Sequence, residues 1–222
     1  MTIRFLGQSG YELQCGDTRI LIDPYLSDIV GRLQNRPRLL PIPAVKIPCD
    51  AVFCTHNHLD HLDPETVTLF PPQQQFYTTS DGCGKLQELG HSNALPLSQT
   101  VTVGDFSITP APAFHSCEAM GLIVKAEGIT LYFSGDTLYN ENLFEISAHK
   151  PDITLICING RLGNMTTEEA LITAKAIGAR VNIPHHYDMF ASNSADPHLF
   201  ADHIPGGKIL EFDQVYTVSD LL

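Results

Sequence analysis

The sequence predicts a layered α/β protein with mixed or antiparallel sheets and helices on the outside. Short runs of apolar and β-branched residues recur along the chain, most of them bounded by turn residues, as is typical of strands. Strand patterns crowd the N-terminal part, whereas helix and strand patterns mix later. No linker, low-complexity tract or internal repeat divides the 222 residues, so we expect a single domain over residues 1–222.

The strand pattern covers residues 2–6, 19–22, 51–55, 75–79, 107–110, 122–126, 129–134, 153–158 and 181–184. Helices are predicted between them, over 64–70, 84–89, 141–148, 167–177 and 197–203. The helix over 167–177 has the clearest signals: Thr166 or Thr167 can cap its start, acidic residues fill its first turn, and Gly178 follows its end.

Residues 24–48 interrupt this pattern. They hold five prolines together with Arg32, Arg36 and Arg38, and they are too long for a simple connection. A loop of this kind either contributes to function or packs on the surface as a structural excursion. The sequence favours neither interpretation.

Charge and composition restrict the partners. The chain has 13 Lys and Arg against 25 Asp and Glu, a formal net charge of -12. Such a surface repels polyphosphate backbones and anionic lipid, so we expect no long nucleic acid and no membrane as partner. No apolar stretch approaches the ~18 residues of a membrane span. The first residues enter a strand pattern without the features of a signal peptide, which favours a cytoplasmic location.

The run Thr55-His56-Asn57-His58-Leu59-Asp60-His61 carries the strongest functional signal. It follows the apolar strand directly, and residues two apart in an extended chain face the same way, so His56 and His58 address one point. Asp60 and His61 fall at the following turn and can reach a second point nearby. Imidazole and carboxylate are ligands that zinc, manganese and iron accept, so the run predicts a metal site.

Further groups of the same kind follow other predicted strands. His115 comes after residues 107–111. Asp136 lies at the end of the strand over 129–134, in the segment Gly135-Asp136-Thr137. The adjacent His185 and His186 lie at the end of the strand over 181–184. Their shared position at strand ends makes them candidate ligands of the same site. The six cysteines contain no CxxC pair and lie mostly in or beside apolar runs, so we interpret them as buried reduced thiols.

Taken together, the HxHxDH run, the single His115, the Gly-Asp-Thr and the late histidine resemble the metallo-β-lactamase superfamily of binuclear hydrolases over essentially the whole chain. Residues 21–25 are similar to the aspartate turn behind that superfamily's site. Residues 158–161, 163–166 and 184–188 resemble the branch that contains L-ascorbate-6-phosphate lactonase. That branch has a longer insertion between the arginine and the Gly-Asn-Met segment, and the lactonase is a longer chain.

The resemblance implies a four-layer αββα sandwich of two mixed sheets, with the site at one edge between them. It also implies a ligand set. One ion is held by His56, His58 and His115, the second by Asp60, His61 and His186, with Asp136 bridging. His186 matches the family's Pro-x-His-Tyr pattern better than His185 does.

This ligand set implies a metal-dependent hydrolase with two divalent ions, zinc or manganese, that lower the pKa of a shared water. Two divalent cations and two carboxylates leave the site with a formal charge of about +2. We expect this charge to attract a small anionic substrate such as a sugar-acid phosphate lactone. Asp60 serves as a ligand and as the group that orients or deprotonates the water. Arg161 is the candidate clamp for a substrate anion, unless it is an ordinary surface arginine; Arg32, Arg36 and Arg38 are weaker candidates.

Two alternatives remain at this point. The same pair of ions supports cleavage of a small phosphodiester or RNA, although the acidic balance disfavours long RNA. The other alternative is a non-catalytic metal-binding protein. Structural metal sites are usually closed and hold one ion, so two complete ligand sets disfavour this alternative. A homo-oligomer is compatible with the sequence, which does not determine the oligomeric state.

Overall fold

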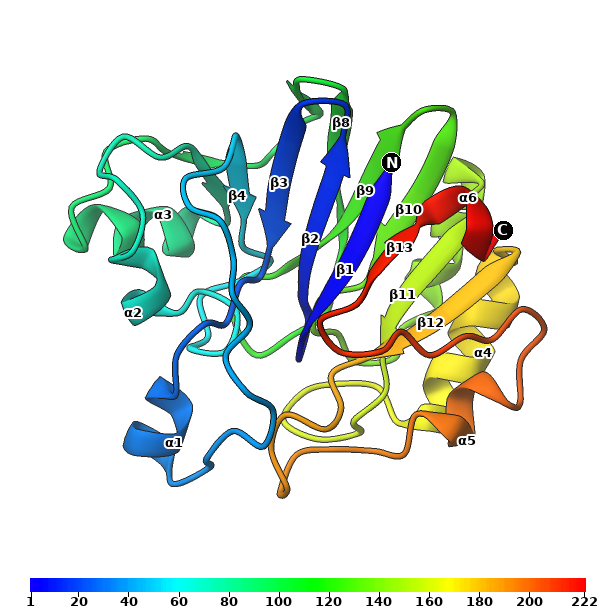
Figure 1. Ribbon diagram of the computed structural model, residues 1–222. Helices are drawn as coiled ribbons and strands as arrows, with labels where there is room; N and C mark the ends of the chain where they lie inside the picture. Colours follow the sequence, from blue (N-terminus) through cyan, green and yellow to red (C-terminus); the bar gives the residue numbers. More distant parts are fainter.

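Two mixed β-sheets face each other in the computed structural model, which describes residues 1–222 (Figure 1). The strands of the first sheet are Thr2–Gly7 (β1), Gly10–Cys15 (β2), Thr18–Ile22 (β3), Ala51–Phe53 (β4), Phe76–Thr78 (β5), Ala94–Pro96 (β6) and Val215–Thr217 (β13). Their order is β13-β1-β2-β3-β4-β5-β6. The pairs from β13 to β3 are antiparallel, and those from β3 to β6 are parallel.

The second sheet has six strands in the order β12-β11-β10-β9-β8-β7. These strands are Val101–Val103 (β7), Phe106–Pro112 (β8), Met120–Ala126 (β9), Ile129–Phe133 (β10), Ile153–Cys157 (β11) and Val181–His185 (β12). Here β10, β11 and β12 are parallel, and β7, β8, β9 and β10 pair antiparallel. It follows that β8, β10 and β12 all run in the same direction.

Seven short helices lie between and after the strands, and some of them cover the outer faces of the two sheets (Figure 1). They are Ile29–Gln34 (α1), Pro64–Val67 (α2), Ser80–Glu88 (α3), the 3-10 helix Glu141–His149 (η1), Thr167–Ile177 (α4), His198–Ala201 (α5) and Val218–Leu221 (α6). In Figure 1, α2 and α3 lie beside the first sheet, and α4 and α5 lie beside the second, which confirms the predicted four-layer αββα sandwich. None of these helices combines the length and the apolar character needed to cross a membrane.

Alternating side chains connect the layers. Ile20 and Ile22 of β3 point into the main core between the sheets, whereas Leu21 packs on the opposite face with residues of α2 and α3. Across the main core, the ring of Tyr11 meets the edge of Phe133 with centroids 5.2 Å apart. Burial on both faces of the sheet explains why residues 20–22 of β3 are apolar without a polar alternation.

The structure confirms all predicted strands and helices with small shifts, and it adds others. The capping box at Thr166 and Glu169 and the left-handed Gly178 set the limits of α4 as the sequence predicts. Helix α3 begins at Ser80, earlier than the predicted 84, because Thr79 caps it by accepting a hydrogen bond from the backbone of Gly82. Strands β2, β6, β7 and β13 are additional, as are helices α1 and α6.

The directions of the strands bring their carboxyl ends to one edge. The HxHxDH run follows β4, His115 follows β8, Asp136 follows β10, and His186 follows β12. The turn between β1 and β2 reaches the same edge, because the backbone N–H of His186 donates to the carbonyl of Gln8 at 2.7 Å. The fold thus gathers at one edge residues that are far apart in the sequence.

Candidate metal centre

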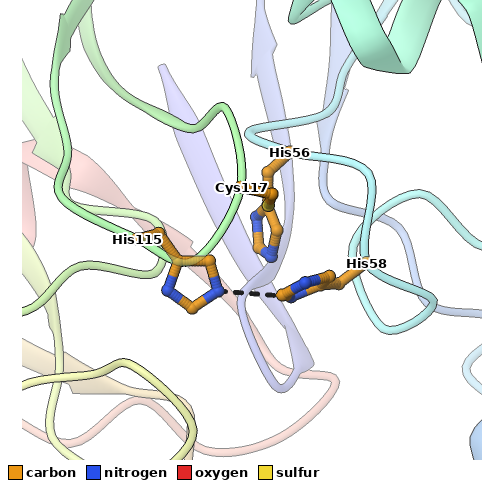
Figure 2. A group of neighbouring side chains, drawn as sticks. All are labelled: His56, His58, His115 and Cys117. Carbon is orange, nitrogen blue, oxygen red and sulfur yellow. Dashed lines mark hydrogen bonds between the residues drawn. The ribbon is translucent and has the colours of Figure 1, made fainter.

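Figure 2 shows a first group of ligand-type side chains around one point. Its members are His56, His58, His115 and Cys117, whose ligand atoms all lie within 4.8 Å of one another. The Nε2 atom of His115 is 3.2 Å from Nδ1 of His58. The other ring nitrogen of His115 is 3.0 Å from the carbonyl oxygen of Gly163, an acceptor, so Nδ1 carries the proton and Nε2 is left with its lone pair toward the group.

A second group contains Asp60, His61 and His186. The Oδ2 atom of Asp60 lies 3.9 Å from Nε2 of His61 and 3.7 Å from Nε2 of His186. Asp60 comes from the turn before α2, and His186 is the first residue after β12. His186 has a φ of 64°, a left-handed conformation that is rare for a non-glycine residue.

The carboxylate of Asp136 lies between the two groups. Its Oδ1 is 3.2 Å from Nε2 of His61 and 3.3 Å from Nε2 of His186, whereas its Oδ2 is 3.9 Å from Nε2 of His115. Each oxygen therefore faces a different group. This is the arrangement of a carboxylate that can bridge two cations.

Asp23 orients this cluster from behind. The backbone N–H and the hydroxyl of Thr55 each donate to its carboxylate at 2.7 Å, and its Oδ2 is 2.8 Å from Nδ1 of His61. This contact fixes the ring of His61 with Nε2 toward Asp136. Asp23 has a φ of 43°, so a left-handed backbone turn after β3 brings its side chain under the site.

The two adjacent late histidines have different surroundings. His186 meets Asp60 and Asp136, whereas Nε2 of His185 is 3.2 Å from the hydroxyl of Ser134. Burial and the neighbouring His186 lower the pKa of His185 to about 3, so His185 is a neutral core histidine. Of the two residues left open by the sequence, the structure thus brings His186 to the cluster.

The electrostatics of the cluster fit a bound cation. Burial lowers the pKa of His56 well below its usual value, so this imidazole is neutral. Burial also acts against the charged form of His61, but the carboxylates of Asp136, Asp23 and Asp60 outweigh it and raise the pKa of His61 well above its usual value. The buried carboxylates are thus stabilised by nearby positive charge, which bound divalent ions would supply.

Unpaired buried atoms support the same conclusion. His56 Nε2, His61 Nε2 and Asp136 Oδ1 are buried and make no hydrogen bond of suitable geometry, although the last two atoms lie 3.2 Å apart. Buried polar atoms without partners are costly in a folded chain and call for an explanation. All three are atoms through which zinc or manganese binds, so the residues present fit a metal centre.

A cavity of about 460 Å³ opens onto the cluster. It is lined by Gln34, Arg36, Asn57, His58, Leu59, Asp60, Ser116, Asp136, Leu162, His186 and Asn193. Only two of the eleven are apolar, so the cavity suits a polar ligand. The predicted Arg161 is exposed and is not among these residues, although its neighbour Leu162 is.

Three residues of this site were missed or undervalued at the sequence level. Cys117 lies in the first ligand group, and Arg36 of the loop over 24–48 lines the cavity. Gln8 is fully buried, and its Nε2 donates to Oδ2 of Asp60 at 2.7 Å and lies 3.0 Å from Nε2 of His186. The one local signal for Gln8 is the glycine on each side of its turn, Gly7 and Gly10.

Comparison with known proteins identifies the family. Residues 18–187 match the family described as beta-lactamase superfamily domain, and the chain belongs to it. A protein named UPF0173 metal-dependent hydrolase from Oenococcus oeni is 27% identical, with 97% of this chain and 99% of that protein covered. The protein of the same name from Methanosphaerula palustris is 29% identical, with 85% of each chain covered.

Solved structures share the fold. Igni18, described as a novel metallo hydrolase from the hyperthermophilic archaeon Ignicoccus hospitalis, superposes with a TM-score of 0.77 at 22% identity, and the match covers 97% of each chain. An isothiocyanate hydrolase from Delia radicum gut bacteria gives a TM-score of 0.81 at 21% identity, with 98% of each chain covered. The four-layer sandwich is therefore the metallo-β-lactamase fold.

Asp23 provides a test of the metal centre that leaves every ligand in place. We expect Asp23→Asn to weaken binding of a divalent ion at the His61 group by about 10- to 100-fold, because an amide orients the imidazole less strongly and adds no negative charge. Titration of zinc against a competing chelator measures the affinity. Asp17→Asn, in the exposed turn between β2 and β3, is the matched control. Equal affinity of both variants would contradict a role of Asp23 in orienting His61.

Proposed function

We propose that the protein is a metal-dependent hydrolase that uses two divalent ions, zinc or manganese, to cleave a small anionic lactone or ester, such as a sugar-acid phosphate lactone. The position of Asp136 is the observation that carries this proposal. One of its oxygens faces His61 and His186 and the other faces His115, so two ligand groups share one carboxylate. Membership of the beta-lactamase superfamily domain family supports it.

The two ligand groups would each hold one ion. His56, His58 and His115 would hold one ion, Asp60, His61 and His186 the other, and Asp136 both. When bound, such a pair of ions supplies a water of lowered pKa and stabilises negative charge on the carbonyl oxygen under attack. Asp60 both lines the cavity and contacts the second group, so its carboxylate is in place to orient the attacking water and accept its proton. Gln8 holds Oδ2 of Asp60 in that position.

The size and lining of the cavity support a small polar substrate. About 460 Å³ accommodates a compact metabolite, and the lining offers amides, a hydroxyl and a guanidinium. The net charge of -12 repels anions from the rest of the surface, whereas the metal centre and Arg36 attract them. Attraction confined to one polar cavity favours a small anion over a long polyanion.

Arg36 is the arginine of the loop over 24–48 that is left for a ligand. Arg32 pairs with Glu65, and Arg38 donates to the carbonyls of Ser27 at 2.7 Å and Leu40 at 2.8 Å. The guanidinium of Arg36 donates a hydrogen bond to the neutral side chain of Gln34. Arg32 and Arg38 thus hold the loop in place, whereas Arg36 lines the cavity.

The direct test of this function combines metal content with turnover. Protein purified without chelator and reconstituted with zinc or manganese is expected to hold two ions per chain by elemental analysis. It is also expected to hydrolyse phosphorylated lactones faster than small phosphodiesters, with both assayed as a panel. One ion or fewer after reconstitution would overturn the binuclear centre, and faster phosphodiester cleavage would overturn the substrate class.

The Asp60→Ala variant tests whether Asp60 takes part in the reaction, apart from any role in folding. Loss of this carboxylate removes a ligand of the second ion and the acceptor for the proton of the water, so turnover is expected to fall by at least about 10²- to 10⁴-fold. Thermal unfolding checks that the fold remains. His149→Ala, at the exposed end of η1, is the control and is expected to be silent. Activity of Asp60→Ala within a few-fold of wild type would place Asp60 outside the reacting centre.

Arginine substitutions test recognition of the anion. A charge-assisted bidentate contact contributes about 1.5–3 kcal/mol, so Arg36→Ala is expected to lower kcat/KM on a phosphorylated lactone by about 10- to 150-fold, mainly through KM. The unphosphorylated lactone is expected to be little affected. Arg161→Ala is measured beside it, because the sequence favours Arg161 for the same task. A selective loss in Arg161→Ala alone would assign the contact to Arg161, and equal losses on both substrates would make either arginine structural.

A further inference from the structure

Cys117 is the one member of the first ligand group that the proposed centre does not use. Its sulfur lies within 4.8 Å of a ligand atom of each of the three histidines (Figure 2). The thiol is free and half-buried, and it belongs to the segment between β8 and β9. No other cysteine of the chain belongs to a ligand group.

The segment that carries Cys117 is held at both ends. His115, two residues earlier, is fixed through its ring to the carbonyl of Gly163 at 3.0 Å. Ala119, two residues later, forms an antiparallel bridge with His56, and the backbone N–H of Met120 donates to the carbonyl of Thr55 at 3.0 Å. The segment is therefore fixed on both sides of Cys117 by contacts that also hold His115 and His56.

The donor set has a definite chemistry. Imidazole and thiolate are ligands that zinc and cobalt accept readily, whereas manganese prefers oxygen ligands. With bond lengths of about 2.0–2.1 Å to nitrogen and 2.3 Å to sulfur, two ligand atoms on the same zinc ion lie at most about 4.4 Å apart. The ligand atoms of this group all lie within 4.8 Å of one another, which is close to the separations that a shared ion requires.

We infer that Cys117 is a further protein ligand, beside Asp136, of the ion held by His56, His58 and His115, and that it makes this position selective for zinc over manganese. The inference rests on the proposed function only in placing an ion at the three histidines. On binding, the thiol loses its proton to solvent and the sulfur donates an electron pair to the ion, with no change of oxidation state. The thiolate also lowers the formal positive charge of the centre by one.

Cobalt(II) reports this bond without any assay of activity. Wild-type protein loaded with cobalt is expected to show the visible bands of protein-bound cobalt and a near-ultraviolet band of thiolate-to-cobalt charge transfer. Cys117→Ser is expected to lose the charge-transfer band and keep the visible bands. Cys49→Ser removes another half-buried free thiol, which lies outside every ligand group, and is expected to keep both. Zinc affinity of Cys117→Ser is expected to fall by at least about tenfold, with manganese affinity nearly unchanged.

The cobalt spectra distinguish failure of the Cys117 inference from failure of the proposed function. Visible cobalt bands without a charge-transfer band in the wild type would overturn the role of Cys117 and leave the histidine site standing. Absence of cobalt binding would overturn the proposed function itself.

A second measurement on the wild type covers the case in which Cys117→Ser does not fold. Zinc is expected to slow alkylation of Cys117 by iodoacetamide, mapped by mass spectrometry, while Cys49 reacts at an unchanged rate. Equal rates at Cys117 with and without zinc would overturn the inference.

Discussion

The buried carboxylate of Asp136 is the constraint on which the rest of the site depends. A carboxylate inside a protein is costly unless cations or hydrogen bonds compensate it. Burial raises the pKa of Asp136, but the imidazoles of His186 and His61 outweigh that effect and hold it well below the usual value. The group therefore stays ionised inside the sandwich, and the ligand-type side chains of both sheets gather around it.

The two-sheet architecture makes this gathering possible. Because β8, β10 and β12 run in one direction, their carboxyl ends deliver His115, Asp136 and His186 to one edge of the second sheet. The first sheet contributes the HxHxDH run after β4, and Asp23 beneath it fixes His61. The site is thus built from turns and strand ends on a rigid frame, which suits a centre that must keep ligand atoms in fixed positions.

Local patterns predicted the parts of the site that depend on local geometry. The alternation of His56 and His58 after a strand, and the capping signals of α4, need only the neighbouring residues to be interpreted. The roles of Gln8, Arg36 and Cys117 depend on tertiary contacts. An amide in a tight turn, an arginine in a proline-rich loop and a cysteine near apolar residues give only weak local signals of a site. Strand β2 was missed although Tyr11 and Leu13 alternate with polar residues, because six residues between two turns give only a short alternation.

The central claim is that Asp136 bridges two ions, and anomalous diffraction tests it most directly. Crystals of zinc-loaded protein, measured on both sides of the zinc absorption edge, are expected to show two anomalous peaks about 3.5–4 Å apart. One peak is expected beside His56, His58 and His115 and the other beside Asp60, His61 and His186, with an oxygen of Asp136 within bonding distance of each. A single peak, or two peaks of which only one contacts Asp136, would contradict the account.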